Sequence, residues 1–350
     1  MNKALGWIGA CALFGLLAVG GCGDQPTNAS ANARGTGKKK LRVGIVFDKG
    51  GRGDKSFNDS AWRGIERAKA EFDIEERAVE SKAEKDYEPN LTALADQGVD
   101  VIVAVGLAMK DSVQGVAPNY PNVKFALVDD VVDAPNVRSL LFKEEEGSFL
   151  AGYLAGLMTT ADKIGFVGGM EIDLIKKFYA GYAAGAKSAN PAIEILPEKY
   201  TGDWNNVDTG KVAANVLFRS GADIVYHAAG KAGLGVIAAA QDNKKLAIGV
   251  DSDQDYIAPG FVLTSMIKRV DEAVYQTIKD VVEGKWSPGT VVYDLKAGGV
   301  GISELKYTKD RIGEEKLKRV REVGDRISSG ELKVPSTKAD LDRFLQTLAQ

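Results

Sequence analysis

Continuous apolar runs of strand length recur along the chain and alternate with segments whose apolar residues return every three or four positions. Continuous runs are typical of strands buried on both faces of a parallel sheet, and the three-to-four spacing predicts helices with one apolar side. The alternation therefore predicts an α/β fold built on parallel sheets. We expect strands at Leu41–Phe47, Val99–Gly106, Lys124–Asp130, Ile164–Gly169, Ile224–Gly230 and Leu246–Asp251. Two clear helical stripes are Phe57, Ala61, Ile65, Ala68 and Phe72, and Val270, Val274, Ile278 and Val281.

The pattern also repeats within the chain. Residues of the same type return 121 positions later at three places, Gly44 and Gly165, Phe57 and Phe178, and Gly64 and Gly185. Gly98 is matched in the same way by Gly221 at an offset of 123. Agreement at nearly one offset indicates two similar α/β halves, although glycine and apolar residues are common enough for chance to remain an alternative.

Two such halves imply a cleft, because ligands of open parallel sheets bind beyond the carboxyl ends of the strands. Aspartate and glycine follow nearly every predicted strand. Each of them alone is explained by the preference for Asp and Gly in turns after strands. Together, however, they would line one cleft with hydrogen-bond acceptors and with backbone that can approach a ligand closely. The residues concerned are Asp48, Gly106, Asp129, Asp130, Gly168, Gly169, Gly230 and Asp251.

The matched phenylalanines suggest what the cleft holds. Phe57 and Phe178 would occupy equivalent places at the start of equivalent helices, one in each half. Two aromatic faces on opposite sides of a cleft suit a flat ring, and a stacked base gains about 1–3 kcal/mol per aromatic partner. The alternative is that both rings belong to the core, which is the commoner place for phenylalanine.

The loop FDKGGRGDKSFN, residues 47–58, resembles a phosphate-binding P-loop only superficially. A P-loop needs a glycine directly before its lysine, and Asp54 stands there, where it would repel a phosphate. A turn between a strand and a helix fits better, with Ser56 at the position of a helix N-cap.

Composition narrows the possible functions. The 350 residues carry a net charge of -3 and no basic patch, which argues against a nucleic-acid partner. The one histidine, His227, lies in an apolar run, where a structural role is commoner than a catalytic one. We find no His/Cys cluster for zinc and no EF-hand loop, so we expect no metal, cofactor or catalytic residue.

The N-terminus predicts export and a lipid anchor. An apolar stretch ends in Leu17-Ala-Val-Gly-Gly-Cys22, which has the form of a lipoprotein signal, with a buried N-terminal helix as the alternative. We expect residues 1–21 to be the signal peptide, Cys22 to carry the lipid, and residues 22–40 to form a flexible tether. No cysteine pair then remains for a disulfide. The mature protein would be held at the membrane on the extracytoplasmic side of the cell envelope.

An ordered set of motifs resembles the basic membrane protein family of lipoproteins, the purine-nucleoside receptor branch of ABC-transporter substrate-binding proteins. The resemblance implies a type I periplasmic binding protein, two parallel-sheet lobes with three hinge crossings. Lobe 1 would comprise residues 41–142 plus 269–285, lobe 2 residues 143–268 plus 286–310, and residues 311–350 a C-terminal helical segment. The motifs are Asp48, Asp54–Asn58, Phe149–Ala155, Gly165–Gly169, Phe178–Tyr182, Ala247–Asp251 and Leu263–Lys268.

The resemblance also implies roles for site residues. Asp48 and Asn58 would bind the polar edge of a base, and Phe57 and Phe178 would cover its two faces. Asp251 would accept hydrogen bonds from the ribose, Lys268 would donate to the same sugar and steady Asp251, and Gly230 would bring backbone close. The remaining ligand-binding positions implied are Gly106, Met109 and Asp129. The loop around Trp204 departs from the family pattern, so Trp204 would be either a lid or a loop anchor.

By this resemblance the protein is a monomer that captures a nucleoside, with purines favoured, and delivers it to the permease and ATPase subunits of an ABC importer. We expect the acidic run Glu144–Glu146 to be a solvated surface. The alternative is that it helps the protein to dock on the permease. Three alternatives remain open: a binding protein for a sugar or a flavin-like ring, a sensor that reports to a membrane receptor, and a nucleoside hydrolase.

Overall fold

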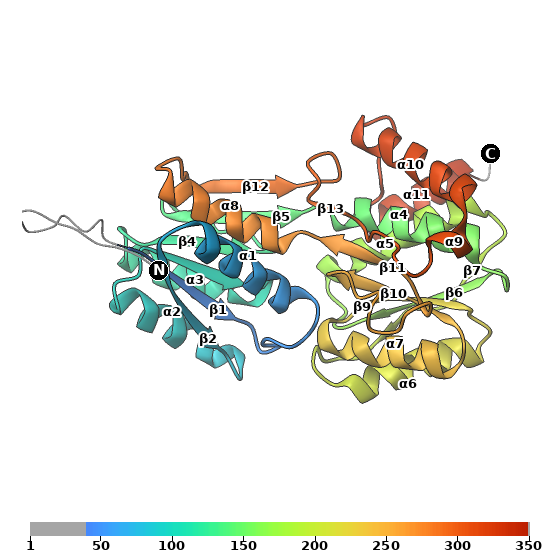
Figure 1. Ribbon diagram of the computed structural model, residues 1–350, viewed down its shortest axis with the longest axis horizontal. Helices are drawn as coiled ribbons and strands as arrows, with labels where there is room; N and C mark the ends of the chain where they lie inside the picture. The colour runs from blue at the N-terminus through green and yellow to red at the C-terminus, as the bar shows by residue number, and fades with distance from the viewer. Residues whose placement is uncertain (1–39, 349–350) are drawn as a thin grey trace, which may run out of the picture. The chain divides into compact units, whose positions relative to one another are not determined.

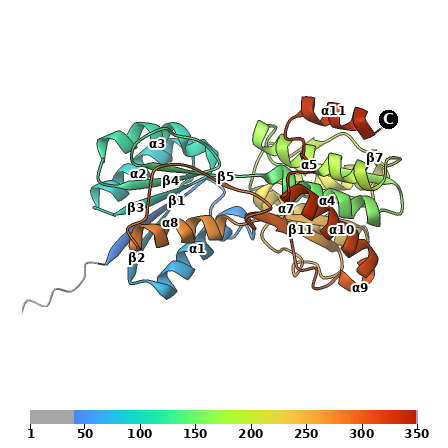
Figure 2. The same cartoon turned by 90° about the horizontal axis from the view of Figure 1, so that it is seen from above.

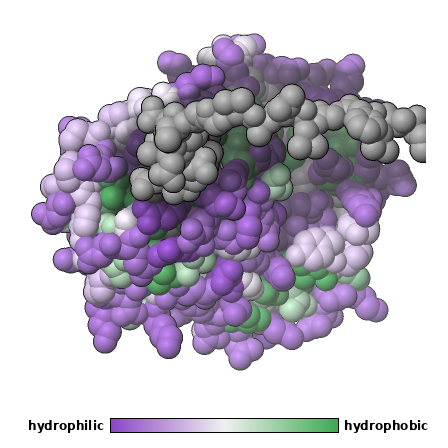
Figure 3. Space-filling model, turned by 60° about the vertical axis from the view of Figure 1, so that its left-hand side comes forward, coloured by the Kyte–Doolittle hydropathy of each residue, from purple (hydrophilic) through white to green (hydrophobic). Residues whose placement is uncertain are grey.

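The computed structural model describes residues 40–348. The predicted signal peptide, the predicted lipidation site Cys22 and nearly all of the predicted tether lie outside these residues. None of the described helices is long and apolar enough to span a membrane. Apolar side chains are scattered over the face drawn in Figure 3, where hydrophilic residues predominate.

The first sheet has six strands, all parallel, in the order β12-β5-β4-β3-β1-β2 (Figure 1). Helices α1 and α8 pack on one face of this sheet, and α2 and α3 pack on the other. Its strands are β1 (Leu41–Phe47), β2 (Ile74–Glu80), β3 (Val101–Val105), β4 (Lys124–Val128), β5 (Val137–Phe142) and β12 (Gly289–Tyr293). Its helices are α1 (Phe57–Glu71), α2 (Tyr87–Asp96), α3 (Lys110–Val116) and α8 (Val270–Val282).

The second sheet has the order β13-β11-β10-β9-β6-β7, with β8 paired to β6, and only β13 runs antiparallel. Helices α4 and α5 cover one face, and α6 and α7 the other (Figure 1), and Figure 2 shows α4 and α5 from above. Its strands are β6 (Lys163–Gly168), β7 (Glu194–Ile195), β8 (Lys199–Tyr200), β9 (Ile224–Ala228), β10 (Leu246–Asp251), β11 (Val262–Lys268) and β13 (Val300–Ile302). Its helices are α4 (Glu144–Met158), α5 (Asp173–Ala189), α6 (Val207–Arg219) and α7 (Gly233–Asp242).

The two lobes repeat one another in detail. The orders β2-β1-β3-β4-β5 and β7-β6-β9-β10-β11 are the same topology. The matched glycines Gly64 and Gly185 have the same task, because each lets a neighbouring helix approach closely. A Cβ at Gly64 would lie 2.5 Å from the carbonyl oxygen of Asp271 in α8, and one at Gly185 would lie 2.1 Å from that of Phe149 in α4. The spacing pattern in the sequence therefore reflects a structural repeat.

The chain passes between the sheets three times, from β5 to α4, from β11 to α8, and from β12 to β13. One predicted boundary is wrong. Residues 286–310 were assigned to the second lobe, but β12 pairs in parallel with β5 in the first sheet, and the crossing comes after Tyr293. The cause is that β12 is a half-exposed edge strand, whose short alternating pattern does not indicate which sheet it joins.

The C-terminal segment completes the second lobe. It consists of α9 (Lys309–Ile312), α10 (Glu314–Ser328) and α11 (Lys338–Leu348). Helix α10 packs against α4, and α11 packs against α5. Leu317, Val320 and Leu341 bury their side chains in this contact layer, so the segment is an integral outer layer of the lobe.

Candidate ligand-binding site

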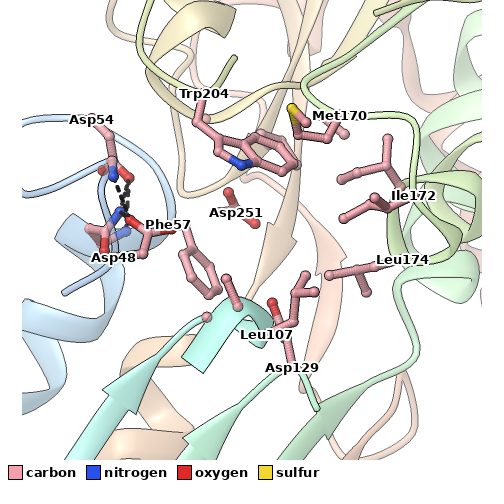
Figure 4. Close-up of a pocket in the computed structure, with 18 of the residues that line it drawn as sticks. Asp48, Asp54, Phe57, Leu107, Asp129, Met170, Ile172, Leu174, Trp204 and Asp251 are labelled. Atoms are coloured by element: carbon pink, nitrogen blue, oxygen red, sulfur yellow. Dashed lines mark hydrogen bonds between the residues drawn. The ribbon is translucent and has the colours of Figure 1, made fainter. Parts of the chain in front are cut away.

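A cavity of about 220 Å³ lies between the lobes, at the carboxyl ends of strands from both sheets (Figure 4). A space of this size fits one small molecule rather than a polymer. Both lobes contribute to its wall. Nine of the ten predicted ligand-binding residues line it, namely Asp48, Phe57, Asn58, Gly106, Asp129, Phe178, Gly230, Asp251 and Lys268.

Met109 is the predicted residue that does not reach the cavity. It ends a short 3₁₀ helix, Leu107–Met109, and its side chain is fully buried in the core beneath α2 and α3. The preceding residues of the same turn, Leu107 and Ala108, line the cavity in its place. The turn therefore directs Met109 into the core and away from the cavity wall.

The first end of the cavity, which we call the loop end, consists of Asp48, Asp54 and Asn58. Asp54 caps helix α1, since its carboxylate accepts from the backbone N–H groups of Ser56, Asn58 and Asp59 at 2.9, 2.8 and 3.1 Å. The side chain of Ser56 makes no capping bond, contrary to its expected role. The aspartate that excluded a P-loop is therefore the residue that starts the helix.

Asp48 and Asn58 form a fixed pair at the loop end. The Asn58 amide Nδ2 donates to Asp48 Oδ1 at 3.0 Å and to Asp54 Oδ2 at 3.2 Å. Asp48 Oδ1 also accepts from the Gly50 backbone N–H at 2.8 Å. Burial raises the pKa of Asp48 above its ordinary value, although the hydrogen bonds from Asn58 and Gly50 lower it. Asn58 Oδ1 is buried and has no partner among the described residues.

The two phenylalanines both line the cavity and lie near the Lys268 ammonium. The Lys268 ammonium lies 5.2 Å from the centroid of the Phe57 ring and 5.7 Å from that of Phe178. The two residues are less equivalent than the sequence suggested. Phe57 is the first residue of α1 and half-buried, whereas Phe178 lies more than one turn inside α5 and is 3% exposed.

The second end, which we call the hinge end, consists of Asp129, Glu144 and Lys268. Lys268 Nζ lies 2.7 Å from Asp129 Oδ1 and 3.0 Å from Glu144 Oε1, and Lys177 pairs with the other Glu144 oxygen at 2.7 Å. Burial alone would lower the pKa of Lys268, but the carboxylates of Asp129 and Glu144 raise it above its ordinary value. Lys268 thus pairs directly with Asp129 and Glu144, and its charge also lowers the pKa of Asp251.

The predicted solvated face Glu144–Glu146 is wrong. All three side chains are buried at the start of α4. Glu144 pairs with Lys268 and Lys177, and Glu146 accepts from Lys143 at 2.9 Å. A run of three acids looks solvated in sequence, because their cationic partners come from distant segments.

Asp129 and Asp251 hold matching backbone positions in the two lobes. Asp129 directly follows β4 and Asp251 ends β10, and their φ angles are 75° and 62°, in the left-handed region that Asp tolerates better than most residues. Ser56 Oγ donates to Asp251 Oδ2 across the lobes at 2.5 Å. Burial raises the pKa of Asp251 to about 7 and that of Asp129 to about 6, although Lys268 lowers both.

An apolar wall from the second lobe was missed by the sequence reasoning. Met170, Ile172 and Leu174, from the β6–α5 connection, face the cavity together with Trp204 (Figure 4). A Cβ at Gly169 would lie 2.2 Å from the Trp204 ring, so this glycine makes room for the indole. Trp204 is also an anchor, because its carbonyl accepts from the Ala232 N–H at 2.9 Å.

Direct hydrogen bonds close the lobes around the cavity. Several side-chain hydrogen bonds cross between them in addition to that of Ser56, and three of these join side chains to the loop 47–58 or to α1. The pairs are Asn205 Nδ2 to the Lys49 carbonyl at 2.9 Å, Gln254 Nε2 to the Lys55 carbonyl at 3.1 Å, and Arg63 Nη2 to Ser252 Oγ at 2.7 Å.

The described residues contain no group of three or more His, Cys, Asp or Glu side chains that could hold a metal ion. His227 is fully buried, its Nε2 lies 3.0 Å from Gln254 Oε1, and burial lowers its pKa to about 4. It supports the interlobe residue Gln254. The cavity therefore offers aromatic faces and carboxylate acceptors, which suit an uncharged ligand rich in donors and disfavour a phosphate.

Known proteins share this fold and sequence. The chain is 33% identical over 362 residues to the ABC transporter nucleoside-binding protein BmpA of Lactococcus lactis, covering 96% of this chain and 100% of that one. It is 34% identical over 389 residues to an uncharacterized lipoprotein of Pyrococcus abyssi, covering 97% and 95%. A solved ABC transporter solute-binding protein of Aeropyrum pernix superposes with a TM-score of 0.79 at 30% identity, covering 88% and 97%.

A family model described as ABC transporter substrate-binding protein PnrA-like matches residues 41–338. This match and the relatives confirm the resemblance seen in the motifs and the two-lobed α/β fold expected from it. The chain belongs to the family of PnrA-like ABC transporter substrate-binding proteins.

Proposed function

We propose that the protein captures a nucleoside between its lobes and delivers it to an ABC importer. The base lies between Phe57 and Phe178, with its polar edge at the loop end and its ribose at the hinge end. The observation that carries this proposal is the set of groups on the cavity wall: one aromatic ring from each lobe, the polar side chains of Asp48 and Asn58, and the carboxylates of Asp129 and Asp251.

The chemistry of the cavity favours a nucleoside over its components and its phosphates. Two aromatic rings give a free sugar less than a base would gain from them, and a free base leaves Asp129 and Asp251 without hydroxyl donors. A 5′-phosphate would bring negative charge towards buried carboxylates, which is unfavourable in a region of low dielectric. The Lactococcus lactis relative that is named as nucleoside-binding supports the same ligand class.

Transport requires a change between open and closed lobes. A ligand that contacts both lobes stabilises the closed form by the difference between its affinities for the two forms. The closed form then docks on a permease, and a separate ATPase subunit drives import. The complete cavity is formed by one chain, which supports a monomer as the binding unit.

We place the protein on the extracytoplasmic side of the membrane, held by a lipid on Cys22. The support is the small-residue run before Cys22 in the sequence and the lipoprotein name of the Pyrococcus abyssi relative. Labelling with a radioactive fatty acid tests this directly. Label that is incorporated by the native chain and absent from Cys22→Ala is the expected result, and equal labelling of both would contradict the anchor.

Calorimetric titration tests the ligand. The full chain, purified in detergent and freed of carried-over ligand, is titrated with adenosine, guanosine, inosine, cytidine, uridine, ribose and free adenine. Nucleosides are expected to bind tightly, and ribose or adenine alone weakly. No heat from any nucleoside would contradict the proposal, and binding of ribose alone would favour a sugar-binding protein instead.

A further inference from the structure

We propose that Gln254 is a latch residue that holds the two lobes closed and so retains the bound molecule, and that His227 positions it. Both residues belong to the second lobe, Gln254 in the connection between β10 and β11 and His227 in β9. Neither lines the cavity. Their task concerns how long the closed form lasts, and it rests on the proposed function only in that a nucleoside is taken to occupy the cavity.

The hydrogen bond that Gln254 makes to the first lobe exists only when the lobes are together. Its Nε2 donates to the backbone carbonyl of Lys55 at 3.1 Å, and beside it Ser252 Oγ donates to the Ser56 carbonyl at 2.9 Å. We call the residues Lys55, Ser56, Ser252 and Gln254 the latch. In these two bonds the first lobe contributes main-chain acceptors and the second lobe contributes side-chain donors.

The main chain at Lys55 takes an uncommon conformation. Its φ is 55°, in the left-handed region that lysine rarely adopts. Such a conformation persists only where the surrounding contacts determine it. The Lys55 N–H donates to Asp59 Oδ2 at 3.0 Å within the first lobe, whereas its carbonyl accepts from Gln254 in the second. The bond across the lobes is therefore one of the contacts that hold this turn.

The orientation of the Gln254 amide is determined within the second lobe. The side chain is fully buried, and its Oε1 accepts from the Val250 N–H at 3.0 Å. A backbone N–H can only donate, so the atom that faces it must be the amide oxygen. The NH₂ group is thereby directed at the Lys55 carbonyl. The reversed amide would set one oxygen against another across the lobes.

His227 fixes the same amide oxygen. Its Nε2 lies 3.0 Å from Gln254 Oε1, which can only accept, so Nε2 carries the proton. Burial lowers the pKa of His227 to about 4, so the ring is neutral at neutral pH and its Nδ1 has no proton. That nitrogen is buried without a hydrogen bond to any described residue. The N–H of the ring is therefore directed at Gln254.

Gly233 confines the histidine ring. A Cβ at Gly233, the first residue of α7, would lie 2.0 Å from His227 Nδ1 and 2.1 Å from its Cε1. The start of the helix can therefore pack directly on the imidazole only because no side chain stands there. These contacts form a chain from α7 through His227 and Gln254 to Lys55 in the other lobe.

A hydrogen bond that is made only in the closed form should slow the opening of the lobes. A ligand enters the open form and closure follows, so the loss of this bond should change the association rate little and raise the dissociation rate. A buried polar group that loses its partner changes an equilibrium by about tenfold or more. The latch therefore predicts a specific kinetic signature.

The first experiment replaces one group of the latch. Gln254→Glu keeps an oxygen towards Val250 and His227, and it replaces the NH₂ group by an oxygen that the Lys55 carbonyl repels. Adenosine, guanosine, inosine, cytidine and uridine are mixed with the full chain in a stopped-flow instrument. Tryptophan fluorescence reports binding, because Trp204 lines the cavity.

For each nucleoside that binds, the dissociation rate is expected to rise about tenfold or more in Gln254→Glu, with the association rate changed by less than about twofold. Gln241→Glu is the matched control, since it adds the same charge at an exposed position of α7 and should change neither rate. An unchanged dissociation rate in Gln254→Glu would overturn the latch. Gln254→Met, which removes the donor without adding a charge, gives the same test if the first variant does not fold.

The second experiment tests the positioning role of His227. His227→Phe fills the space of the ring without an N–H, whereas His227→Gln can present an amide N–H near the place of Nε2. The dissociation rate is expected to rise severalfold in His227→Phe and to return most of the way to the native value in His227→Gln. A purely structural role would lower the stability of both variants without this distinction, so equal dissociation rates would contradict positioning.

Hydrogen exchange separates the latch from the proposed function. Residues 54–58 lie against the second lobe and are unaltered in Gln254→Glu, so faster exchange of their amides reports opening. Exchange is measured on the full chain with the tightest-binding nucleoside, or without any if none binds. It is expected to be about tenfold faster in Gln254→Glu than in the native chain.

The outcomes are distinct. If no nucleoside binds the native chain, the proposed function fails and the latch is judged by exchange alone. If nucleosides bind but neither dissociation nor exchange is faster in Gln254→Glu, the function stands and the latch fails. A circular dichroism spectrum of each variant that matches the native one confirms that folded proteins are compared.

Discussion

The loop end and the hinge end of the cavity both contain buried carboxylates, but only one of them is neutralised by the protein itself. At the hinge end, Asp129 and Glu144 alternate with Lys268 and Lys177 in a chain of paired charges. At the loop end, Asp48 and Asp54 rely on amide donors, and Asn58 Oδ1 has no partner among the described residues.

The difference assigns separate tasks to the two ends. The hinge end is electrically complete before a ligand arrives, so it acts as a preformed support at the place where the chain passes between lobes. The loop end instead holds a buried acceptor, Asn58 Oδ1, without a hydrogen bond to any described residue. Under the proposed function, affinity common to all nucleosides would come from the rings and the hinge end, and the loop end would meet the edge of the base.

The largest expected effect follows from breaking the hinge end. Lys268→Met leaves Asp129 and Glu144 buried without their shared cation, which costs about 3–5 kcal/mol of the free energy of unfolding. Urea denaturation of both proteins at neutral pH measures it. Lys177→Met is the matched control with a smaller expected loss, because the Lys177 side chain is 29% exposed. A loss below about 1 kcal/mol for Lys268→Met would show that the charge chain is not a structural support.

Removing either ring should weaken nucleoside binding, and the two variants should differ in how much folding stability they lose. Phe57→Ala and Phe178→Ala are each expected to lose about 1–3 kcal/mol of binding free energy. Phe178→Ala should also lose stability, since that ring is part of the core. Phe72→Ala is the control: this ring stacks on Tyr275 away from the cavity, so its loss should affect stability alone. Unchanged affinity in both cavity variants, with folding intact, would contradict stacking.

Acidification should weaken binding through Asp251. Burial raises its pKa to about 7, so the free carboxyl gains a proton as the pH falls through that value and then accepts fewer ribose hydroxyls. Nucleoside affinity is expected to be about tenfold lower at pH 6 than at pH 8. The same raised pKa means that the contribution of this group to folding stability falls as the pH rises from about 4 to about 7.

Titrations at several pH values test this dependence. Asp251→Asn should flatten it. Asp255→Asn is the control, because burial also raises the pKa of Asp255, to about 6, but its carboxylate bonds Ser265 and Ser303 and does not line the cavity. A pH profile that survives in Asp251→Asn would assign the titration to another group.

The smallest expected effect concerns the interlobe bond of Ser56. Its hydroxyl donates to Asp251, and this hydrogen bond lowers the pKa of that carboxyl against the effect of burial. Ser56→Ala should therefore move the midpoint of the pH dependence of binding upwards, by about one pH unit or less. A midpoint that stays fixed would show that Ser56 does not influence the carboxylate in solution.

The strands buried on both faces were predictable because their apolar runs are continuous. Leu41–Phe47 and Leu246–Asp251 match β1 and β10 at both ends. Strand β2 was not predicted, since its sequence IEERAVE is largely polar at a sheet edge and carries no continuous apolar run. The same absence of a burial signal led to the wrong assignment of β12 to the second lobe.

The candidate site was predictable mainly through the family resemblance, because each of its residues alone also fits ordinary turn chemistry. Asp48, Asn58 and Asp251 follow strands or open a helix, and all three line the cavity. Ile172 and Leu174 could not be distinguished from core residues, because cavity-facing and core-facing apolar side chains look alike in sequence. The ion-pair partners of Lys268 could not be predicted either, because Asp129 and Glu144 lie more than 120 positions away in the chain.

The most direct test of the account is a crystal structure of the protein with a bound nucleoside. The account predicts the base between the Phe57 and Phe178 rings, its polar edge at Asp48 and Asn58, and its ribose hydroxyls within hydrogen-bond distance of Asp251. A nucleoside found with its base at the hinge end, or bound outside this cavity, would contradict the division of tasks between the two ends.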